Sequence, residues 1–175
     1  MSKILCSKTR LDMYETFYEI EFNDCIGDLL RIPDVQGLGD FGQHFDTNRL
    51  QHSINVAYYS YLLCKILHWD FRSAARAGTL HDLFLYDWRE MPQDEHHAFA
   101  HPKRALENAR KNICLNPIEE DAILKHMWPL CKSAPRYKES FVVSLADKYC
   151  CAGEVISSFK TALARKYTNL KRRFA

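Results

Sequence analysis

An imidazole and a carboxylate lie side by side at His81 and Asp82, within the small and apolar stretch from Ala74 to Phe84. Burying an ionised carboxylate without a partner costs on the order of several kcal/mol or more. Asp82 therefore needs a cation, hydrogen-bond donors or solvent. The chain also offers three further histidines and one more embedded aspartate, namely His52, His101, His126 and Asp147. We interpret these six residues as the ligands of a metal centre with one or two ions.

The ligand types narrow the chemistry of such a centre. Imidazole and carboxylate ligands suit Fe, Mn, Zn, Co or Ni, and Mg, which prefers purely oxygen ligands, is a further candidate. A hydrolytic site needs ligands of this kind, a bridging carboxylate, and open positions for water and substrate. None of the seven cysteines falls in a C-x-x-C pair, which disfavours a cysteine-rich zinc site.

Each candidate also has a plainer structural interpretation. His52 could be a hydrogen-bonded core histidine, and His81, Asp82 and Asp147 could form buried salt bridges with an arginine or lysine. His101 and His126 could simply cap or end their helices. The ordered set of all six residues favours the metal centre.

Composition limits the remaining options. The chain has 175 residues, of which 47% are hydrophobic and 26% charged, with a net charge of +2. These values suit one globular domain and give no strong general attraction to nucleic acid or to an anionic membrane. No signal peptide, membrane span or paired-cysteine pattern is evident, so we expect a reduced, cytoplasmic protein.

The elements that must position the candidates are helices, because apolar residues recur at steps of three and four through most of the chain. We predict an all-α fold, a single-domain bundle of about six to seven helices. Asp46 to Asn48, Asp70 and Asn116 are cap candidates, and Pro102 at a first helical position makes His101 a cap residue. The predicted helices cover about residues 9–31, 49–67, 71–85, 102–112, 117–126, 137–152 and 153–167. The loops include 37–42, 85–94 and 130–135. The ligands would come from five helices or helix ends, as in sites built inside helical bundles.

The ordered motifs resemble the HD-domain phosphohydrolase superfamily. The matching stretches are Arg49 to Ala57 around His52, Gly78 to Asp82, and Ser144 to Lys148 around Asp147, with His101-Pro102 and His126-Met127 between them. The resemblance covers residues 45–154 and leaves 155–175 as a basic C-terminal helix or tail of the same domain, 1–175.

The resemblance implies a bundle fold and a metal-dependent phosphohydrolase. His52, His81, Asp82 and Asp147 would hold the first metal, and Asp82 would bridge to a second ion held by His101 and His126. Asp82 and His81 would be the central catalytic residues, and a hydroxide between the metals would attack phosphorus. The expected substrate is a small phosphate ester or anhydride, in particular a nucleotide.

Two features depart from the family pattern. Many members place Gly-Lys shortly after His-Asp, whereas this chain continues Leu83-Phe84-Leu85-Tyr86. The Gly-Tyr-Pro signature of the cyclic-dinucleotide branch is also missing. The missing lysine favours one rival, a catalytically silent ligand-binding or regulatory module, and the missing Gly-Tyr-Pro speaks against a cyclic dinucleotide as substrate. A second rival is a di-iron oxygenase, because the resemblance includes relatives of this fold that perform such chemistry.

Four basic residues are candidates for phosphate contact, because each lies near a ligand in the sequence: Arg49, Arg104, Lys125 and Lys148. The expected partner is thus a small phosphorylated molecule, not a membrane or nucleic acid, and a homo-oligomer is compatible with the sequence.

Overall fold

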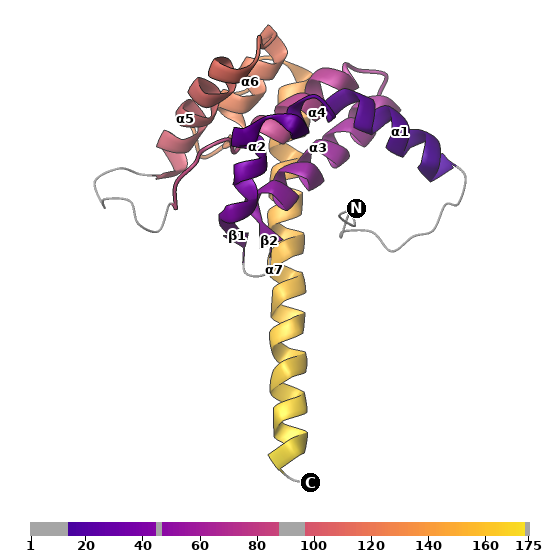
Figure 1. Ribbon diagram of the computed structural model, residues 1–175, viewed down its shortest axis with the longest axis vertical. Coiled ribbons are helices and arrows are strands. Elements are labelled where there is room, and N and C mark those ends of the chain that lie inside the picture. The colour runs from indigo at the N-terminus through magenta and orange to yellow at the C-terminus, as the bar shows by residue number, and fades with distance from the viewer. Residues whose placement is uncertain (1–13, 45–46, 88–96, 174–175) are drawn as a thin grey trace.

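The computed structural model describes residues 14–44, 47–87 and 97–173, which form a body of packed helices from which one long helix extends (Figure 1). The described part contains seven α-helices, and the structure is 72% helical, which confirms the predicted all-α bundle. Its elements are α1 (Tyr14–Ile26), η1 (Leu29–Arg31), α2 (Pro33–Gly37), η2 (Leu38–Asp40), β1 (Gly42–His44), β2 (Thr47–Asn48), α3 (Arg49–Ile66), α4 (Phe71–Leu80), α5 (His97–Asn112), α6 (Pro117–Lys125) and α7 (Lys138–Arg173).

Helix α3 runs through the middle of the body and packs most extensively against α4. Gly78 allows this close contact, because a Cβ atom there would lie 2.7 Å from the Cα atom of Ala57. The core around this contact is built from small and aliphatic side chains, including Val56, Ala74 and Ala77. The same close packing brings the end of α4, where His81 lies, towards the face of α3 that carries His52.

Side-chain caps fix where three helices begin, as the sequence predicts. The Asn48 side chain accepts a hydrogen bond from Gln51 N at the start of α3, and Asp70 accepts one from Ser73 N at the start of α4. Asn116 forms a reciprocal capping box with Glu119 at the start of α6. Caps of this kind satisfy amide groups that have no partner inside the helix.

Two predicted helix boundaries are wrong near the ligands. We expected α5 to begin at Pro102, but it begins at His97 and carries Pro102 inside its second turn. Pro102 has no N–H to donate to the carbonyl group one turn earlier, but the helix continues on both sides of it. The predicted helix 71–85 ends at Leu80, and His81 and Asp82 lie in the turn that follows.

The predicted break at Gly153 is also wrong. Residues 138–173 form one continuous helix, α7, of 36 residues. Glycine inside a helix costs about 1 kcal/mol relative to alanine and does not by itself end the helix.

The N-terminal half differs in smaller ways. The predicted helix 9–31 appears as α1 and η1, and its residues 9–13 lie outside the described residues. The predicted loop 37–42 contains the short helix η2 and leads into β1, which pairs antiparallel with β2. Part of the predicted loop 85–94 also lies outside the described residues. None of the described helices is long and apolar enough to cross a membrane.

Candidate metal centre

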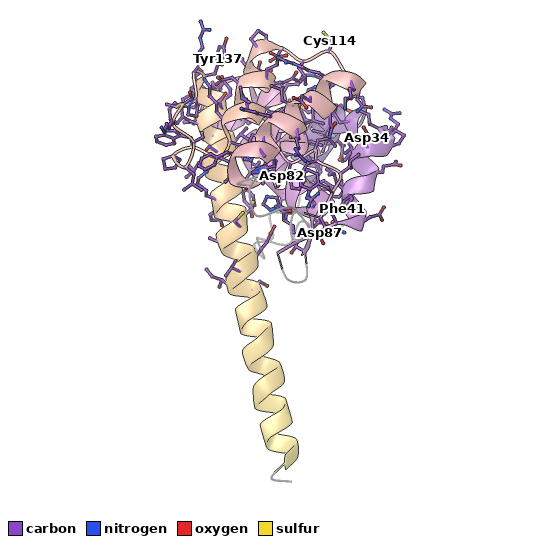
Figure 2. The ribbon with its side chains drawn as sticks, turned by 90° about the vertical axis from the view of Figure 1, so that its left-hand side faces the viewer. Asp34, Phe41, Asp82, Asp87, Cys114 and Tyr137 are labelled. Carbon is purple, nitrogen blue, oxygen red and sulfur yellow. The ribbon has the colours of Figure 1, made fainter. Side chains whose placement is uncertain are left out.

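All six predicted ligands meet inside the body, although they come from five separate places in the fold. His52 lies on α3, His81 and Asp82 follow α4, His101 lies on α5, His126 follows α6 and Asp147 lies on α7. Each of the six is buried, with at most 7% of its surface exposed. Figure 2 places Asp82 within the body.

Asp82 lies between two groups of imidazoles. Its Oδ2 atom is 3.6 Å from His81 Nε2, while its Oδ1 atom is 3.4 Å from His101 Nε2 and 3.6 Å from His126 Nε2. Two sets of potential metal ligands therefore share this carboxylate: His52, His81 and Asp82 in one, and Asp82, His101 and His126 in the other. A carboxylate that turns one oxygen towards each set is suited to bridge two ions.

His81 and His126 are oriented towards the centre by the same kind of local hydrogen bond. Each follows the last residue of a helix, and each Nδ1 atom lies 2.8 Å from the carbonyl oxygen three residues earlier, that of Gly78 or Ile123. When Nδ1–H donates to this carbonyl, the Nε2 lone pair points into the centre. This is the tautomer that a metal-ligating histidine requires.

His52 is held between two carboxylates of α7. Its Nε2 atom is 3.2 Å from Asp147 Oδ1, and its Nδ1 atom is 3.1 Å from Glu154 Oε1. Asp147, Cys151 and Glu154 follow one another at steps of four and three, so they share one face of the helix. Cys151 Sγ lies 3.5 Å from Asp147 Oδ1, and His52, Asp147 and Cys151 form a third set of potential ligands.

The pKa values of the buried histidines and aspartates depend on one another. Burial alone would lower the pKa of His52, but the hydrogen bonds to Asp147 and Glu154 outweigh it and raise this pKa to about 10. Burial would raise the pKa of Asp82, yet the charges of His81, His101 and His126 lower it. Burial and the neighbouring charges of His81 and His101 lower the pKa of His126 to about 3.

Two buried atoms of the centre are available to bind a metal ion. Among the described residues, His81 Nε2 and Asp82 Oδ1 find no hydrogen-bond partner. A buried polar atom without a partner costs about 1–3 kcal/mol, so native structures usually provide one. Both atoms face the shared centre, where a divalent cation would satisfy them.

Three supporting residues were not predicted. Gln43 on β1 donates from Nε2 to Asp82 Oδ2 over 2.9 Å, and its own Oε1 accepts from Arg49 Nε over 3.2 Å. Glu154 and Cys151 are the others. Once 138–173 is recognised as a single helix, the spacing from Asp147 identifies both, whereas no sequence signal points to Gln43.

The four predicted phosphate contacts all have partners within the protein. Arg49 is fully buried and donates to the carbonyl oxygen of Phe84 over 2.6 Å. Arg104 lies over the ring of Tyr86, and Lys125 pairs with Asp121 over 2.6 Å. Lys148 donates to the carbonyl oxygens of His126 and Ser144, over 2.9 and 3.1 Å. Their role towards substrate stays a prediction.

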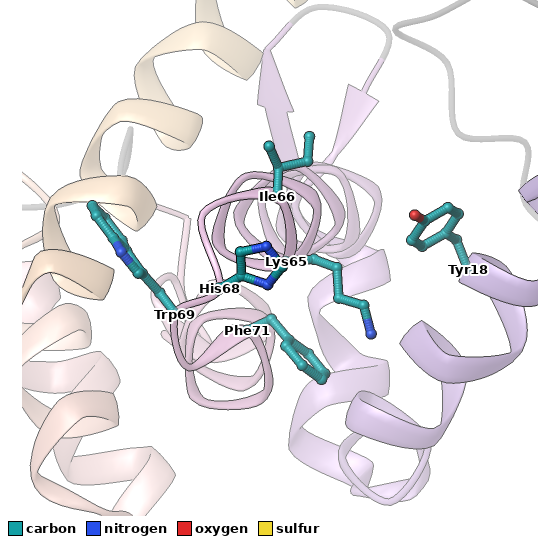
Figure 3. A pocket seen from close by; sticks show the side chains of 6 residues that line it. All are labelled: Tyr18, Lys65, Ile66, His68, Trp69 and Phe71. Atoms are coloured by element: carbon teal, nitrogen blue, oxygen red, sulfur yellow. The ribbon is translucent and has the colours of Figure 1, made fainter.

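A separate cavity of about 500 Å³ lies at the far end of α3, away from the ligands (Figure 3). Tyr18, Lys65, Ile66, His68, Trp69 and Phe71 line it. Lys65 Nζ is 2.6 Å from Glu21 Oε2 and 4.4 Å from the centre of the Phe71 ring, so its charge is used in a structural pair. We therefore place the chemistry at the buried centre, where the metal-binding residue types converge, and not in this cavity.

Comparison of the chain with protein-family models, with curated proteins and with solved structures found no match. The assignment of function therefore depends on the centre itself, whose buried His, Asp and Cys groups could hold a metal ion.

Proposed function

We propose that this protein is a metal-dependent phosphohydrolase of the HD-domain type, which cleaves a phosphate ester or anhydride of a small molecule such as a nucleotide. The observation that carries the proposal is the position of Asp82, whose two oxygens face two separate groups of histidines. The ordered sequence motifs around His52, His81 and Asp147 support it further.

The residues for one ion would be His52, His81, Asp82 and Asp147, and those for a second would be Asp82, His101 and His126. Divalent ions bound there would supply an activated water molecule near neutral pH and would stabilise negative charge on the phosphate oxygens. Fe, Mn, Zn, Co or Ni suits this mixture of imidazole and carboxylate, and Mg suits it less well.

The protein groups around the ligands have their own tasks in this proposal. The carbonyl groups of Gly78 and Ile123 fix the tautomers of His81 and His126. Gln43 restrains Asp82, and Glu154 restrains His52. Such outer contacts fix ring and carboxylate orientations and increase metal affinity.

The test is a turnover screen on protein that has been stripped with a chelator and reloaded with Mn, Fe(II), Co, Ni, Zn or Mg. The substrates are nitrophenyl phosphate mono- and diesters and nucleoside mono-, di- and triphosphates, and released phosphate and nucleotide products are measured. We expect turnover with at least one transition metal, and its loss in Asp82→Asn. The matched control is Asp28→Asn, because Asp28 forms a half-exposed ion pair with Arg76 away from the centre.

Three results would contradict the proposal. Fully metal-loaded protein without turnover on any substrate would favour a silent binding module. Oxygen consumption with the optical signature of a mixed-valent iron pair would favour an oxygenase. Turnover that Asp82→Asn retains would place the chemistry elsewhere.

A further inference from the structure

Where α7 passes the body, one of its apolar faces is buried and the opposite face is largely exposed, although the ring of Tyr149 on that face lies edge-on to Tyr59 of α3, with ring centres 5.1 Å apart. Val143, Ala146 and Cys150 are buried on the packed face, together with the ligand Asp147. On the other face, Leu145 is 62% exposed, and Tyr149 and Ile156 are each 55% exposed. A run of large apolar side chains on an exposed face is typical of an interaction surface.

The sequence continues the spacing of these residues as a heptad pattern along the part of α7 that extends beyond the other elements (Figure 1). The seam comprises, at alternating steps of four and three, Leu145, Tyr149, Ala152, Ile156, Phe159, Leu163, Lys166 and Leu170. Apolar residues that keep this spacing over three or more heptads indicate a coiled coil. A helix of this kind without a packing partner is only marginally stable in water.

We propose that the seam is a dimer interface and that its partner is α7 of a second copy of this chain, running antiparallel. The body packs mainly against the opposite face of α7, so the seam residues Leu145, Tyr149 and Ile156 stay more than half exposed. One register covers the whole seam by pairing Leu145 with Leu170, Tyr149 with Lys166, Ala152 with Leu163, and Ile156 with Phe159.

The antiparallel direction follows from the residues that would meet. A parallel pair would set Lys166 against its own copy and Ala152 against Ala152, giving a like-charge contact and a gap. The antiparallel pair sets the small Ala152 against Leu163, and it places the Lys166 ammonium near the aromatic ring of Tyr149, a favourable cation–π arrangement.

Net charge favours the same direction. Residues 155–175 contain six basic and no acidic residues, so this segment has a net charge of +6. The remaining 154 residues contain 18 basic and 22 acidic residues, and their net charge is −4. A parallel dimer would bring the two basic segments together along their length. The antiparallel dimer separates them and lays each beside the acidic body of the other copy.

The experiment is sedimentation equilibrium of the full-length protein over a concentration series. We expect a dimer of about 41 kDa, twice the chain mass of 20.5 kDa. The double substitution Ile156→Glu with Leu163→Glu should raise the dimer dissociation constant about 100-fold or more, because it introduces unpaired charges into the seam. The matched control Thr161→Glu adds a charge off the seam and should leave the dissociation constant unchanged. Circular dichroism checks that each variant retains its helix content.

A photo-crosslinking residue at position 170 tests the direction. We expect mass spectrometry of the crosslinked dimer to recover peptides around Leu145, whereas crosslinks around position 170 itself would overturn the antiparallel register. A protein that stays monomeric at every concentration would overturn the dimer, and so would a monomer that binds vesicles of phosphatidylserine and phosphatidylcholine through this helix.

Discussion

Glu154→Gln isolates the effect of the carboxylate behind His52. Both Glu154 oxygens lie close to His52 Nδ1, at 3.1 and 3.3 Å, and glutamine keeps the size of the side chain while removing its charge. Loss of a group that orients a metal-ligating histidine typically weakens metal affinity 10–100-fold. We therefore expect a loss of about 1.4–2.8 kcal/mol in the free energy of metal binding.

The assay is a competition titration of chelator-stripped protein with Co²⁺ or Zn²⁺ against an indicator of known affinity. The matched control is Glu139→Gln, a second buried glutamate of α7, whose Oε1 accepts from Asp70 N over 3.2 Å. This control should lose stability and keep its metal affinity. If Glu154→Gln binds metal within about twofold of the native protein, Glu154 does not support a ligand and the reasoning fails.

Three further predictions concern stability. Lys148→Met should lower the free energy of unfolding by about 2 kcal/mol, because the His126 carbonyl loses a charged donor; an unchanged urea midpoint would show that this contact contributes nothing. Gly78→Ala should cost about 1–3 kcal/mol, since its Cβ atom would overlap Ala57, and a melting temperature equal to that of the native protein would contradict the close packing. In metal-free protein, the raised pKa of His52 gives stability that is complete below about pH 6.5 and is lost towards about pH 10. The lowered pKa of His126 removes stability as the pH falls from about 6.5 towards 3. The melting temperature should therefore peak near pH 6.5, and a flat profile between pH 6.5 and 9.5 would refute this.

The sequence predicts the six converging residues well because each has a distinctive residue type in a distinctive context. A histidine on an apolar helical face, or an aspartate within an apolar run, needs a partner wherever it is buried. The helical period then places His52 and Asp147 on inward faces of their helices. The structure brings all six together, which the physical argument for a shared cation requires.

The features that the sequence did not predict have specific physical causes. Treating Gly153 as a helix boundary separated Glu154 from Asp147 and hid their shared face. Treating Pro102 as a first helical residue placed His101 outside the helix, although α5 begins at His97. Gln43 lies on a strand too short to show periodicity, and its contact with Asp82 depends on tertiary packing.

Arg49 shows what sequence spacing alone does not give, namely the partners of a charged side chain within the fold. It lies one helical turn before His52, which led us to expect it beside the site. In the structure its guanidinium lies 3.6 Å from the centre of the Phe84 ring and donates to the Phe84 carbonyl oxygen. Arg49 therefore holds Gln43 and the turn after Asp82 in place through hydrogen bonds to the Gln43 side chain and the Phe84 carbonyl group.

The most direct test of the account is the metal content of the purified full-length protein, measured by mass spectrometry of the elements against protein concentration. We predict one or two divalent transition-metal ions per chain. The Asp82→Asn variant should lose most of this metal, and the Asp28→Asn control should keep all of it. A folded protein that contains no stoichiometric metal, and that takes up none when titrated with Mn, Fe(II), Co, Ni or Zn, would contradict the claim that a cation gathers these six side chains.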